Sequence, residues 1–322
     1  MDTEKVSIII PAFNAAETLT ETVVSVLNGT YKNIEILIVD DCSSDDTGKL
    51  AASFAEKNPQ IQYHKNEQNY GVSKSRNLMI NKATGEFVAF LDSDDTWEPN
   101  KLEVCVKFLK ENPDIKAVAH ALRYLDKHGT KVSYIPTYPT TREEMNTMKE
   151  KGELPWTFPS AAVIYRETLL IEKGFLEDWQ VGEDVELFAR IAHNHGLLAT
   201  KMPLANYRIR GNSLTDKYWL KKRIANDCIK ENQQRRIQGE KEFSLNEYED
   251  LYFNNLPYFK KLNKLRELLA LHYMRKAGQS WLNREILSAL FFGVATTALN
   301  PQASLNKLKW MKYQERLSQE ST

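Results

Sequence analysis

The stretch Glu86-Phe87-Val88-Ala89-Phe90-Leu91-Asp92-Ser93-Asp94-Asp95 leads an apolar strand directly into three carboxylates within four residues. Burying carboxylates at a strand end is costly unless a cation or hydrogen-bond donors balance their charge. Asp92-Ser93-Asp94 therefore indicates a site for a hard divalent ion and, through that ion, for phosphate. The same residues also fit a solvated turn whose aspartates cap a helix starting near Pro99, and the stretch alone leaves both interpretations open.

Apolar runs and helical patterns alternate along the chain before this stretch. Runs typical of buried parallel strands lie at 6–11, 35–39, 61–64 and 86–91, and helical patterns lie between them at 14–27, 48–57 and 71–83. Asn14, with Glu17 three residues later, predicts a capping box at the first helix. The alternation predicts an α/β fold with a doubly wound, mostly parallel sheet flanked by helices. Ligands of such sheets bind beyond the carboxyl ends of the strands, which are followed here by Asn14, Asp40, Asp41, Asp92 and Asp94.

The remainder of the chain is first irregular and then helical. We expect a helix at 101–111, strands at 117–124 and 160–165, a Thr- and Pro-rich loop around 135–160, and a helix at 185–195. Beyond Asp216, long helical patterns cover 218–238, 258–278 and 286–299. The last run has 14 residues, too few to cross a bilayer as a helix, so we expect a buried or interfacial helix.

The formal charges sum to zero but are unevenly distributed. Residues 1–216 hold 24 Lys+Arg and 32 Asp+Glu, whereas residues 217–322 hold 19 and 11. A nucleic-acid reader would carry its basic groups around its site, so this class is excluded. The basic end suits peripheral contact with an anionic membrane surface, with Trp281 and Trp310 as anchors. Lysine-rich helices that are merely soluble, or that pack on the first region, explain the same charge.

The start of the chain and its cysteines indicate the compartment. The N-terminal residues carry an acidic flank and a short apolar run, which does not resemble a signal peptide. Cys42, Cys105 and Cys228 are far apart and odd in number, without zinc-ligand or disulfide spacing. We therefore expect a cytoplasmic protein. Together with the basic C-terminal region, this also allows peripheral contact with the inner face of the cell membrane.

Several segments together resemble successive motifs of glycosyltransferase family 2, whose members have the GT-A fold. The matching segments are Val6-Ser7-Ile8-Ile9-Ile10-Pro11-Ala12-Phe13-Asn14, Val39-Asp40-Asp41-Cys42-Ser43-Ser44-Asp45-Asp46-Thr47, Asn69-Tyr70-Gly71-Val72-Ser73-Lys74-Ser75-Arg76-Asn77, Phe90-Leu91-Asp92-Ser93-Asp94-Asp95 and Gly182-Glu183-Asp184. The resemblance covers roughly residues 5–215. It implies a Rossmann-like GT-A catalytic domain at 1–216, with a nucleotide-binding half at 1–100 and an acceptor-binding half at 101–216. Residues 217–322 would form a helical C-terminal region.

The resemblance implies an inverting, metal-dependent transfer from a nucleotide sugar, and a UDP-sugar is the expected donor. The residues it assigns to the donor are Pro11, Ala12, Phe13 and Asn14 beside the nucleoside, Asp41 at the base, Asp92 and Ser93 near the ribose, and Arg76. Asp94 would ligate Mn²⁺ or Mg²⁺, which favour oxygen ligands and diphosphate. Arg76 on an exposed helix face could instead be merely solvated.

The resemblance in the later motifs implies which residues act on the acceptor. Asp184 matches the base that takes the acceptor hydroxyl proton, although Glu183 and Asp184 also suit a helix N-terminus through its dipole. Glu183 and the loop residue Trp156 are the acceptor-binding candidates. Many relatives carry histidine where Arg210 stands; arginine cannot ligate a cation, so we predict that Arg210 clamps the diphosphate. Arg190 is expected to form structural ion pairs.

The predicted function is transfer of a sugar to a saccharide or lipid-linked saccharide acceptor in surface polysaccharide biosynthesis. A sugar-nucleotidyltransferase is the alternative enzyme, but that class expects a glycine-rich loop after the first strand, and Pro11–Thr18 contains no glycine. The third hypothesis is that the protein is a non-catalytic partner that binds nucleotide sugar in a membrane assembly. Loss of Asp94 or of the Glu183-Asp184 pair would favour it, and all three residues are present.

Overall fold

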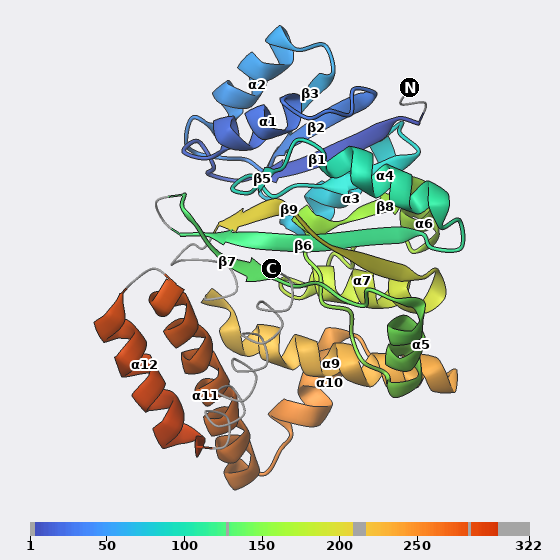
Figure 1. The fold of residues 1–322 in the computed structure, drawn as a ribbon. Helices are drawn as coiled ribbons and strands as arrows, with labels where there is room; N and C mark the ends of the chain where they lie inside the picture. The colour runs from blue at the N-terminus through green and yellow to red at the C-terminus, as the bar shows by residue number, and fades with distance from the viewer. Residues whose placement is uncertain (1–3, 127–128, 209–216, 283–284, 302–322) are drawn as a thin grey trace. The chain divides into compact units, whose positions relative to one another are not determined.

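The computed structural model describes residues 4–126, 129–208, 217–282 and 285–301 (Figure 1). Its strands are β1 Val6–Ala12, β2 Ile34–Asp40, β3 Ile61–Lys65, β4 Phe87–Phe90, β5 Thr96–Trp97, β6 Ala117–Leu125, β7 Lys131–Ile135, β8 Val163–Tyr165 and β9 Leu197–Arg208. Its helices are α1 Leu19–Leu27, α2 Thr47–Lys57, α3 Val72–Lys82, α4 Lys101–Glu111, α5 Arg142–Lys151, α6 Arg166–Ile171, α7 Glu183–Asn194, α9 Trp219–Gln238, α10 Leu245–Glu249, α11 Tyr258–Leu282 and α12 Ile286–Leu299. Two short turns, η1 Pro159–Ala161 and the π-helical η2 Asp250–Asn254, complete the described elements.

One sheet runs through the first part of the chain in the order β3-β2-β1-β4-β8-β6-β9-β5, with β7 paired to β6. The strands β3, β2, β1 and β4 are mutually parallel, as their buried apolar sequences predict. Beyond β4 the sheet is mixed, because β8 is antiparallel to both β4 and β6 while β6 and β9 are parallel. The predicted α/β architecture and the helical C-terminal region are therefore confirmed, with a sheet that is parallel only in its first part.

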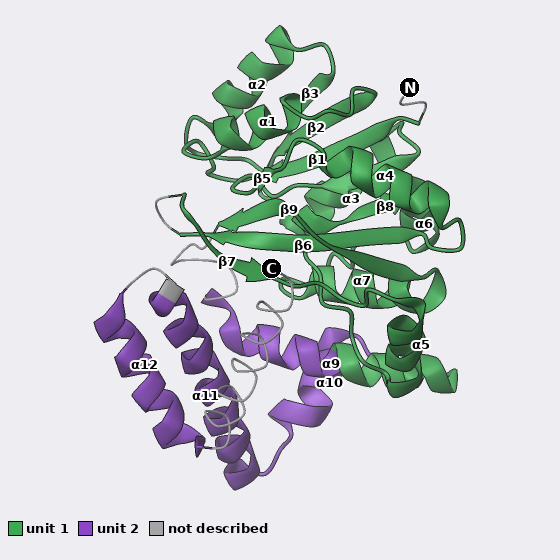
Figure 2. Cartoon of the chain, viewed as in Figure 1, with its two compact units in different colours: residues 1–208, 229–242 green, residues 209–228, 243–322 purple. Residues whose placement is uncertain are grey.

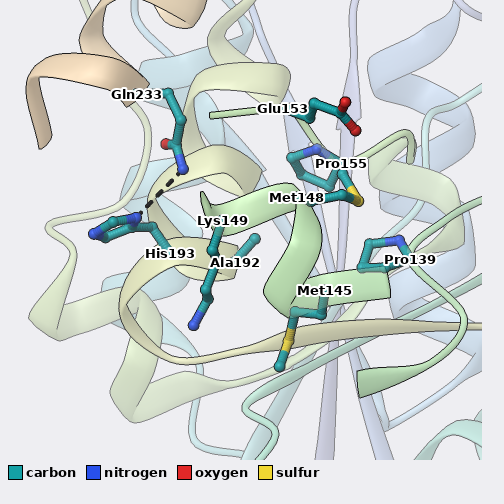
Figure 3. A pocket seen from close by; sticks show the side chains of 9 residues that line it. All are labelled: Pro139, Met145, Met148, Lys149, Glu153, Pro155, Ala192, His193 and Gln233. Carbon is teal, nitrogen blue, oxygen red and sulfur yellow. Dashed lines mark hydrogen bonds between the residues drawn. The ribbon is translucent and has the colours of Figure 1, made fainter. Parts of the chain in front are cut away.

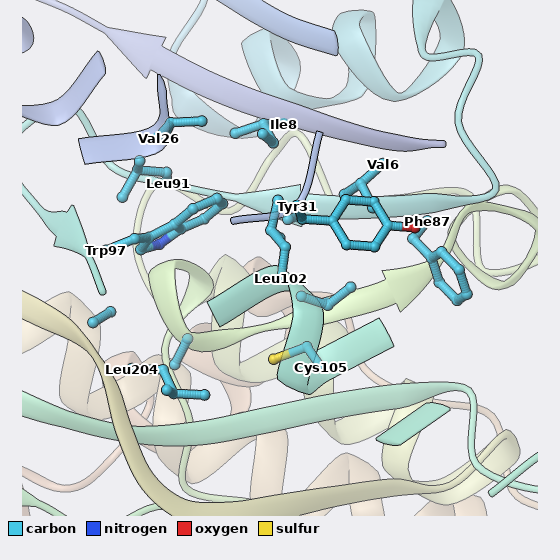
Figure 4. Packing of buried hydrophobic residues seen from close by; sticks show 14 of the residues in the cluster. Val6, Ile8, Val26, Tyr31, Phe87, Leu91, Trp97, Leu102, Cys105 and Leu204 are labelled. Carbon is cyan, nitrogen blue, oxygen red and sulfur yellow. The ribbon is translucent and has the colours of Figure 1, made fainter. Parts of the chain in front are cut away.

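The central strands send alternate side chains into two cores. Ile8 and Ile10 of β1 lie in the core shared with α1, α2 and α4 (Figure 4), whereas Ile9 lies in the core shared with α3, α6 and α7. Burial on both faces explains why the strand is a continuous apolar run and not an alternating one. Each fully buried side chain of this size contributes about 1.5–3 kcal/mol. The sheet thus holds the ends of its strands on a rigid base.

The capping box predicted at Asn14 is wrong. The helix α1 begins five residues later, at Leu19, and its N-cap residue Thr18 makes no side-chain capping bond. Asn14 instead has a φ of 49°, and its Oδ1 accepts a hydrogen bond of 2.9 Å from the backbone N–H of Ser44. The β2–α2 loop therefore uses the asparagine that the local pattern assigns to a helix start. A helix does occur within the predicted 14–27 pattern, and its residues Leu19, Val23 and Val26 are buried.

The irregular middle contains more regular structure than the sequence predicts. The helix α5 lies inside the expected 135–160 loop and has a full capping box between Thr141 and Glu144. The strands β7 and β9 and the two-residue strand β5 were also not expected. The helices predicted at 101–111 and 286–299 occur with those bounds. The alternative in which the aspartates cap the helix near Pro99 is wrong, because Asn100 is the N-cap of α4.

The chain forms two compact units (Figure 2). The first contains residues 1–208 and 229–242, and the second contains residues 209–228 and 243–322, so each takes part of α9. Within the second unit α11 and α12 pack together, with Tyr273 and Phe292 stacked at 5.8 Å between ring centroids. No helix among the described residues is both long and apolar enough to span a membrane. The domain limits inferred from the sequence stay a prediction.

Candidate active site

Parallel pairing brings the carboxyl ends of β1, β2 and β4 to one edge of the sheet. Ala12 at the end of β1 pairs with Asp40 of β2, and Ile9 of β1 pairs with Phe90 at the end of β4. Residues that follow these strands therefore share this edge. The sequence predicted that gathering from strand order alone, and the structure confirms it for the loops that follow the three strands.

The loop after β1 is tied to the loop after β2. The backbone N–H of Asn14 donates to Ser43 Oγ at 3.0 Å, and that of Ala15 donates to Thr47 Oγ1 at 2.8 Å. Pro11 and Ala12 are buried in β1. Phe13 follows them with half of its surface exposed (50%). An exposed aromatic ring on a fixed loop offers a flat apolar face to a ligand at this edge.

Asp41 is buried and already holds the loop between β3 and α3. Its Oδ1 accepts hydrogen bonds from Asn66 Nδ2 and from the backbone N–H of Tyr70, each at 2.8 Å, and its Oδ2 accepts one from the N–H of Gly71 at 2.8 Å. A carboxylate has about four acceptor positions, so one remains on Oδ2 for a further donor. Asp41 therefore orders the loop as well as facing this edge of the sheet.

Arg76 links the loop after β4 to the start of α7. Its NH2 atom lies 2.6 Å from Asp92 Oδ1, and its NH1 atom lies 3.3 Å from Glu183 Oε1. The guanidinium is 3% exposed and lies 5.1 Å from the ring centroid of Phe175. The interpretation of Arg76 as a solvated surface residue is therefore wrong.

Burial and neighbouring charges act on this guanidinium in opposite directions. Burial alone would lower the pKa of Arg76, but Asp92 and Glu183, with a smaller effect from Asp184, raise it overall. The charge therefore persists at any pH at which the protein folds. A permanent positive charge thus lies between the Asp92-Ser93-Asp94 segment and the Glu183-Asp184 pair.

The loop after β4 is held from several directions. The backbone N–H of Asp92 donates to Ser160 Oγ at 3.1 Å, and the Ser93 carbonyl accepts from Thr18 Oγ1 at 2.8 Å. Arg208, the last residue of β9, donates from Nε to the Asp94 carbonyl at 3.1 Å. No local pattern indicated this role for Arg208, because its partners Asp94 and Asp95 are more than a hundred positions away.

The backbone N–H of Asp95 closes a turn onto the Asp92 carbonyl at 3.0 Å. Its side chain, however, is buried, and its Oδ1 accepts from the backbone N–H of Arg208 at 3.0 Å. Burial, followed by the nearby charges of Asp94 and Asp92, raises the pKa of Asp95 well above its ordinary value. Asp95 therefore fixes the loop from inside, whereas Asp92 and Asp94 are only partly buried.

The carboxylates at this edge fit a cation that the ligand helps to bind. Among the described residues no group of three or more His, Cys, Asp or Glu side chains is arranged to hold a metal by itself. Mg²⁺-type ions commonly take one or two protein carboxylates and complete their shell with substrate phosphates and water. A partly buried Asp94 at a strand end matches that donor set.

The start of α7 carries the predicted base. Gly182 precedes it with a φ of 84°, a left-handed conformation that a residue without Cβ adopts at no steric cost. Asp184 lies in the first turn, and its Oδ1 accepts a hydrogen bond of 2.9 Å from the backbone N–H of Val185. Glu183 beside it is held by Arg76. The bond at Asp184 is consistent with a helix-dipole role, and the link through Arg76 brings the pair to the Asp92 loop.

An aromatic row extends from the same region. Trp156 is 49% exposed and meets Phe158 edge to face with 5.8 Å between ring centroids; Phe158 in turn meets Tyr207 at 5.4 Å. Burial, and then the charge of Asp95, raises the pKa of Tyr207. The row therefore connects an exposed indole ring to the carboxylate loop. Tyr207 and Phe158 were not singled out from the sequence.

Arg190 and His193 lie further along α7 than Asp184. Arg190 forms ion pairs with Glu186 at 2.6 Å and Glu172 at 3.2 Å, as its structural interpretation predicts. His193 lines a small open hollow on the first unit, where its Nδ1 meets Gln233 Nε2 at 3.3 Å (Figure 3). None of the residues lining that hollow belongs to the predicted site. Arg210 lies outside the described residues.

The mixed sheet with flanking helices is similar to GT-A-type glycosyltransferase structures. The model of the family "Glycosyl transferase family 2" matches residues 7–171. This chain belongs to glycosyltransferase family 2. The match includes the β1, β2 and β4 loops described above.

Individual relatives agree with this assignment. An "Uncharacterized glycosyltransferase" of Rickettsia bellii is 34% identical over 217 residues, which are 66% of this chain and 30% of the relative. The E. coli protein named UDP-Glc:alpha-D-GlcNAc-diphosphoundecaprenol beta-1,3-glucosyltransferase WfgD is 42% identical over 112 residues, 35% of this chain and 44% of the relative. The chain thus spans about a third of the length of the first curated relatives it matches.

Solved structures support the fold. S. aureus TarS (residues 1–349) in complex with UDP-GlcNAc has a TM-score of 0.57 and 18% identity, over 91% of each chain. The mannosyltransferase PcManGT from Pyrobaculum calidifontis, in complex with GDP-Man and Mn²⁺, has a TM-score of 0.54 and 20% identity, over 96% of this chain and 80% of that one. At these identities the likeness shows the fold alone.

Proposed function

We propose that this protein is an inverting glycosyltransferase that moves a sugar from a UDP-sugar to a saccharide or lipid-linked saccharide. The observation that carries the proposal is the Arg76 bridge, which joins Asp92 at 2.6 Å to Glu183 at 3.3 Å. Through it, the predicted donor loop and the predicted base loop are parts of one site. The UDP-GlcNAc complex of TarS and the UDP-Glc in the name of WfgD support a uridine nucleotide as the donor.

In this proposal the donor binds along the strand ends. The exposed ring of Phe13 packs on the nucleoside beside Pro11, Ala12 and Asn14, and Asp41 accepts a hydrogen bond from the base at its remaining position on Oδ2. Asp92 and Ser93 lie near the ribose. Arg210 would hold the diphosphate as a fork of donors.

Asp94 is the proposed protein ligand of Mn²⁺ or Mg²⁺. When bound, such an ion would neutralise the negative charge that develops on the departing nucleoside diphosphate. The chain's contribution is to fix Asp94: Arg208 binds its carbonyl, and the buried Asp95 anchors the next position. The Mn²⁺ in the PcManGT complex supports a divalent ion in a protein of this fold.

Asp184 is the proposed general base. Inversion by single displacement needs a base on the face of the sugar opposite the leaving group. Asp184 would take the proton of the acceptor hydroxyl as its oxygen forms the bond to the anomeric carbon, while the bond to the nucleoside diphosphate breaks. Glu183, held by Arg76, would orient the acceptor beside it.

The acceptor and the surroundings of the enzyme are also proposals. Trp156, exposed at the end of the aromatic row, offers a flat surface on which a sugar ring can stack. We assign residues 1–100 to the donor half, 101–216 to the acceptor half and 217–322 to a helical region that contacts the membrane surface. A role in surface polysaccharide synthesis at the inner face of the cell membrane fits the diphosphoundecaprenol in the name of WfgD. Cys42, Cys105 and Cys228 form no disulfide among the described residues, which is consistent with a reducing compartment.

The test is sugar transfer or donor hydrolysis by the purified protein with Mn²⁺ and a panel of UDP- and dTDP-sugars. Asp184→Asn should lower kcat about 10²–10⁴-fold and leave donor binding unchanged. Asp178→Asn is the matched control, since Asp178 is an exposed carboxylate shortly before α7. Equal turnover by Asp184→Asn removes this residue from its role. Donor binding without any turnover by the unmodified protein would support a non-catalytic partner.

A further inference from the structure

The helix α12 is a 14-residue helix without a charged side chain. Leu287, Leu290, Phe291 and Val294 follow each other at the spacing of one helical stripe, and all four are at least 60% exposed. Leu287 is 84% exposed. A stripe of large apolar side chains open to water is unusual for a surface helix and marks a contact surface.

The rest of α12 is already packed. Thr296, on the side of the helix opposite Leu287, is 2% exposed, and Phe292 stacks on Tyr273 of α11. The exposed stripe is therefore the side that α11 leaves uncovered. We call Leu287, Leu290, Phe291 and Val294 the α12 stripe.

The surroundings of this stripe within the second unit are basic. The helix α11 has six Lys or Arg residues and one Glu. The described residues of the second unit together hold ten Lys or Arg and six Asp or Glu. Burial, and then the positive charges of Lys276 and Arg223, lower the pKa of His272 on α11. An apolar stripe with a net positive charge around it complements an anionic lipid surface, which offers acyl chains and negative head groups together.

We propose that the α12 stripe inserts into an anionic lipid surface and so determines how the protein docks on a membrane. A helix of 14 residues is about 21 Å long, shorter than the apolar core of a bilayer, so α12 would lie in the interface without crossing it. Trp281, 65% exposed near the end of α11, suits the boundary between head groups and acyl chains. The inference rests on the membrane contact proposed above and names the surface that makes it.

The test compares binding of the full chain to vesicles of phosphatidylcholine alone and to vesicles with roughly one-third phosphatidylglycerol. Co-sedimentation should occur with the anionic vesicles, and raising NaCl from about 0.1 to about 1 M should weaken it by screening the charge. Leu287→Gln/Phe291→Gln should lower the partition coefficient at least about tenfold, because each large side chain loses its apolar burial. Leu170→Gln/Ile171→Gln is the matched control, since both residues are exposed on α6 of the first unit.

Each other result overturns the proposal. If the stripe variant binds vesicles like the control, the stripe is not the docking surface. If the protein ignores vesicles but associates with itself in sedimentation equilibrium, and the stripe variant does not, a second copy covers the stripe. If the variant instead lowers Tm, another part of the chain covers it. Donor hydrolysis by the same variants is measured in detergent-free buffer, so that loss of the enzymatic function and loss of docking are told apart.

Discussion

Replacing Arg76 by methionine tests whether one guanidinium holds the two carboxylate loops together. Methionine keeps a long apolar side chain beside Phe90 and Phe175 but removes the contacts to Asp92 at 2.6 Å and Glu183 at 3.3 Å. Removing one partner from a buried ion pair costs about 3–5 kcal/mol. Because the side chain of Asp92 is 32% exposed and water can reach it, we expect a loss of about 3 kcal/mol in urea unfolding.

The same substitution should change the pH dependence of the reaction. Arg76 is a positive charge close enough to Asp184 for the two groups to interact. Removing a nearby positive charge raises the pKa of a carboxyl group, so the acidic limb of kcat/KM should move to higher pH. Arg76→Lys keeps the charge, so it should leave this limb in place and lower kcat/KM through geometry alone.

Two results would refute this reasoning. One is a Met variant that loses less than about 1 kcal/mol of stability, which would mean that the bridge is not buried as described. The other is an unchanged acidic limb in a variant that still folds, which would leave Arg76 a purely structural residue. Thermal unfolding and circular dichroism of both variants establish that the compared proteins are folded.

Three further substitutions probe the sheet and the carboxylate loop that it carries. Glu35 is buried among hydroxyl, amide and ammonium donors, whose hydrogen bonds outweigh the effect of burial and lower its pKa from 4.5 to about 2. The ionised side chain therefore contributes up to about 3 kcal/mol to the free energy of unfolding above pH about 4.5, and this contribution is lost as the pH falls towards 2. Glu35→Gln should remove that part of the pH dependence in urea unfolding. Arg208→Met frees the carbonyl of Asp94 and should raise the Mn²⁺ concentration for half-maximal activity about tenfold, with little change in Tm. Gly85→Ala places a Cβ 2.7 Å from the carbonyl of Lys5 and should cost about 1–3 kcal/mol.

Each of these has its control and its contrary outcome. Glu21→Gln removes only the exposed partner of Arg208, 2.6 Å away, and should leave Mn²⁺ dependence within about twofold of the original. A Glu35→Gln protein with the same loss of stability in acid would place the titrating group elsewhere. Gly278→Ala is the control for the glycine, since nothing lies within 4 Å of its added Cβ, and similar stability in both alanine variants would contradict the close approach.

Periodicity in the sequence was sufficient for the elements that depend on local pattern and strand burial. The run Val6–Ala12 is buried throughout and apolar at every position except Ser7, which is the pattern of a buried parallel strand. β9 is different: Thr200, Lys201 and Met202 interrupt it at a bulge opposite His120, and the alternation is lost there. Such strands are determined by their neighbours more than by their own residues.

The residues of the site also fall into those that a local pattern predicts and those that only the folded structure reveals. Asp92, Asp94 and Asp184 could be singled out because carboxylates at a strand end or a helix start form local patterns. The partners of Arg76 are 16 and 107 positions away, and the bond from Arg208 to Asp94 spans 114 positions. Side-chain contacts at such separations leave no periodic signal in a single sequence. Asn14 shows the converse, since a local capping pattern lost to a hydrogen bond with a loop 30 positions later.

The first compact unit consists of two separate segments of the chain, and this affects the design of truncated and chimeric proteins. Residues 229–242 return to it after 209–228, and there Gln233 meets His193 while Gln234 Nε2 donates to the Lys151 carbonyl at 2.8 Å. A fragment that ends at Arg208 would lose both contacts and expose the surfaces beneath them. Fusion proteins and family chimeras should therefore be joined after Glu242, well beyond the segment by which the family is recognised.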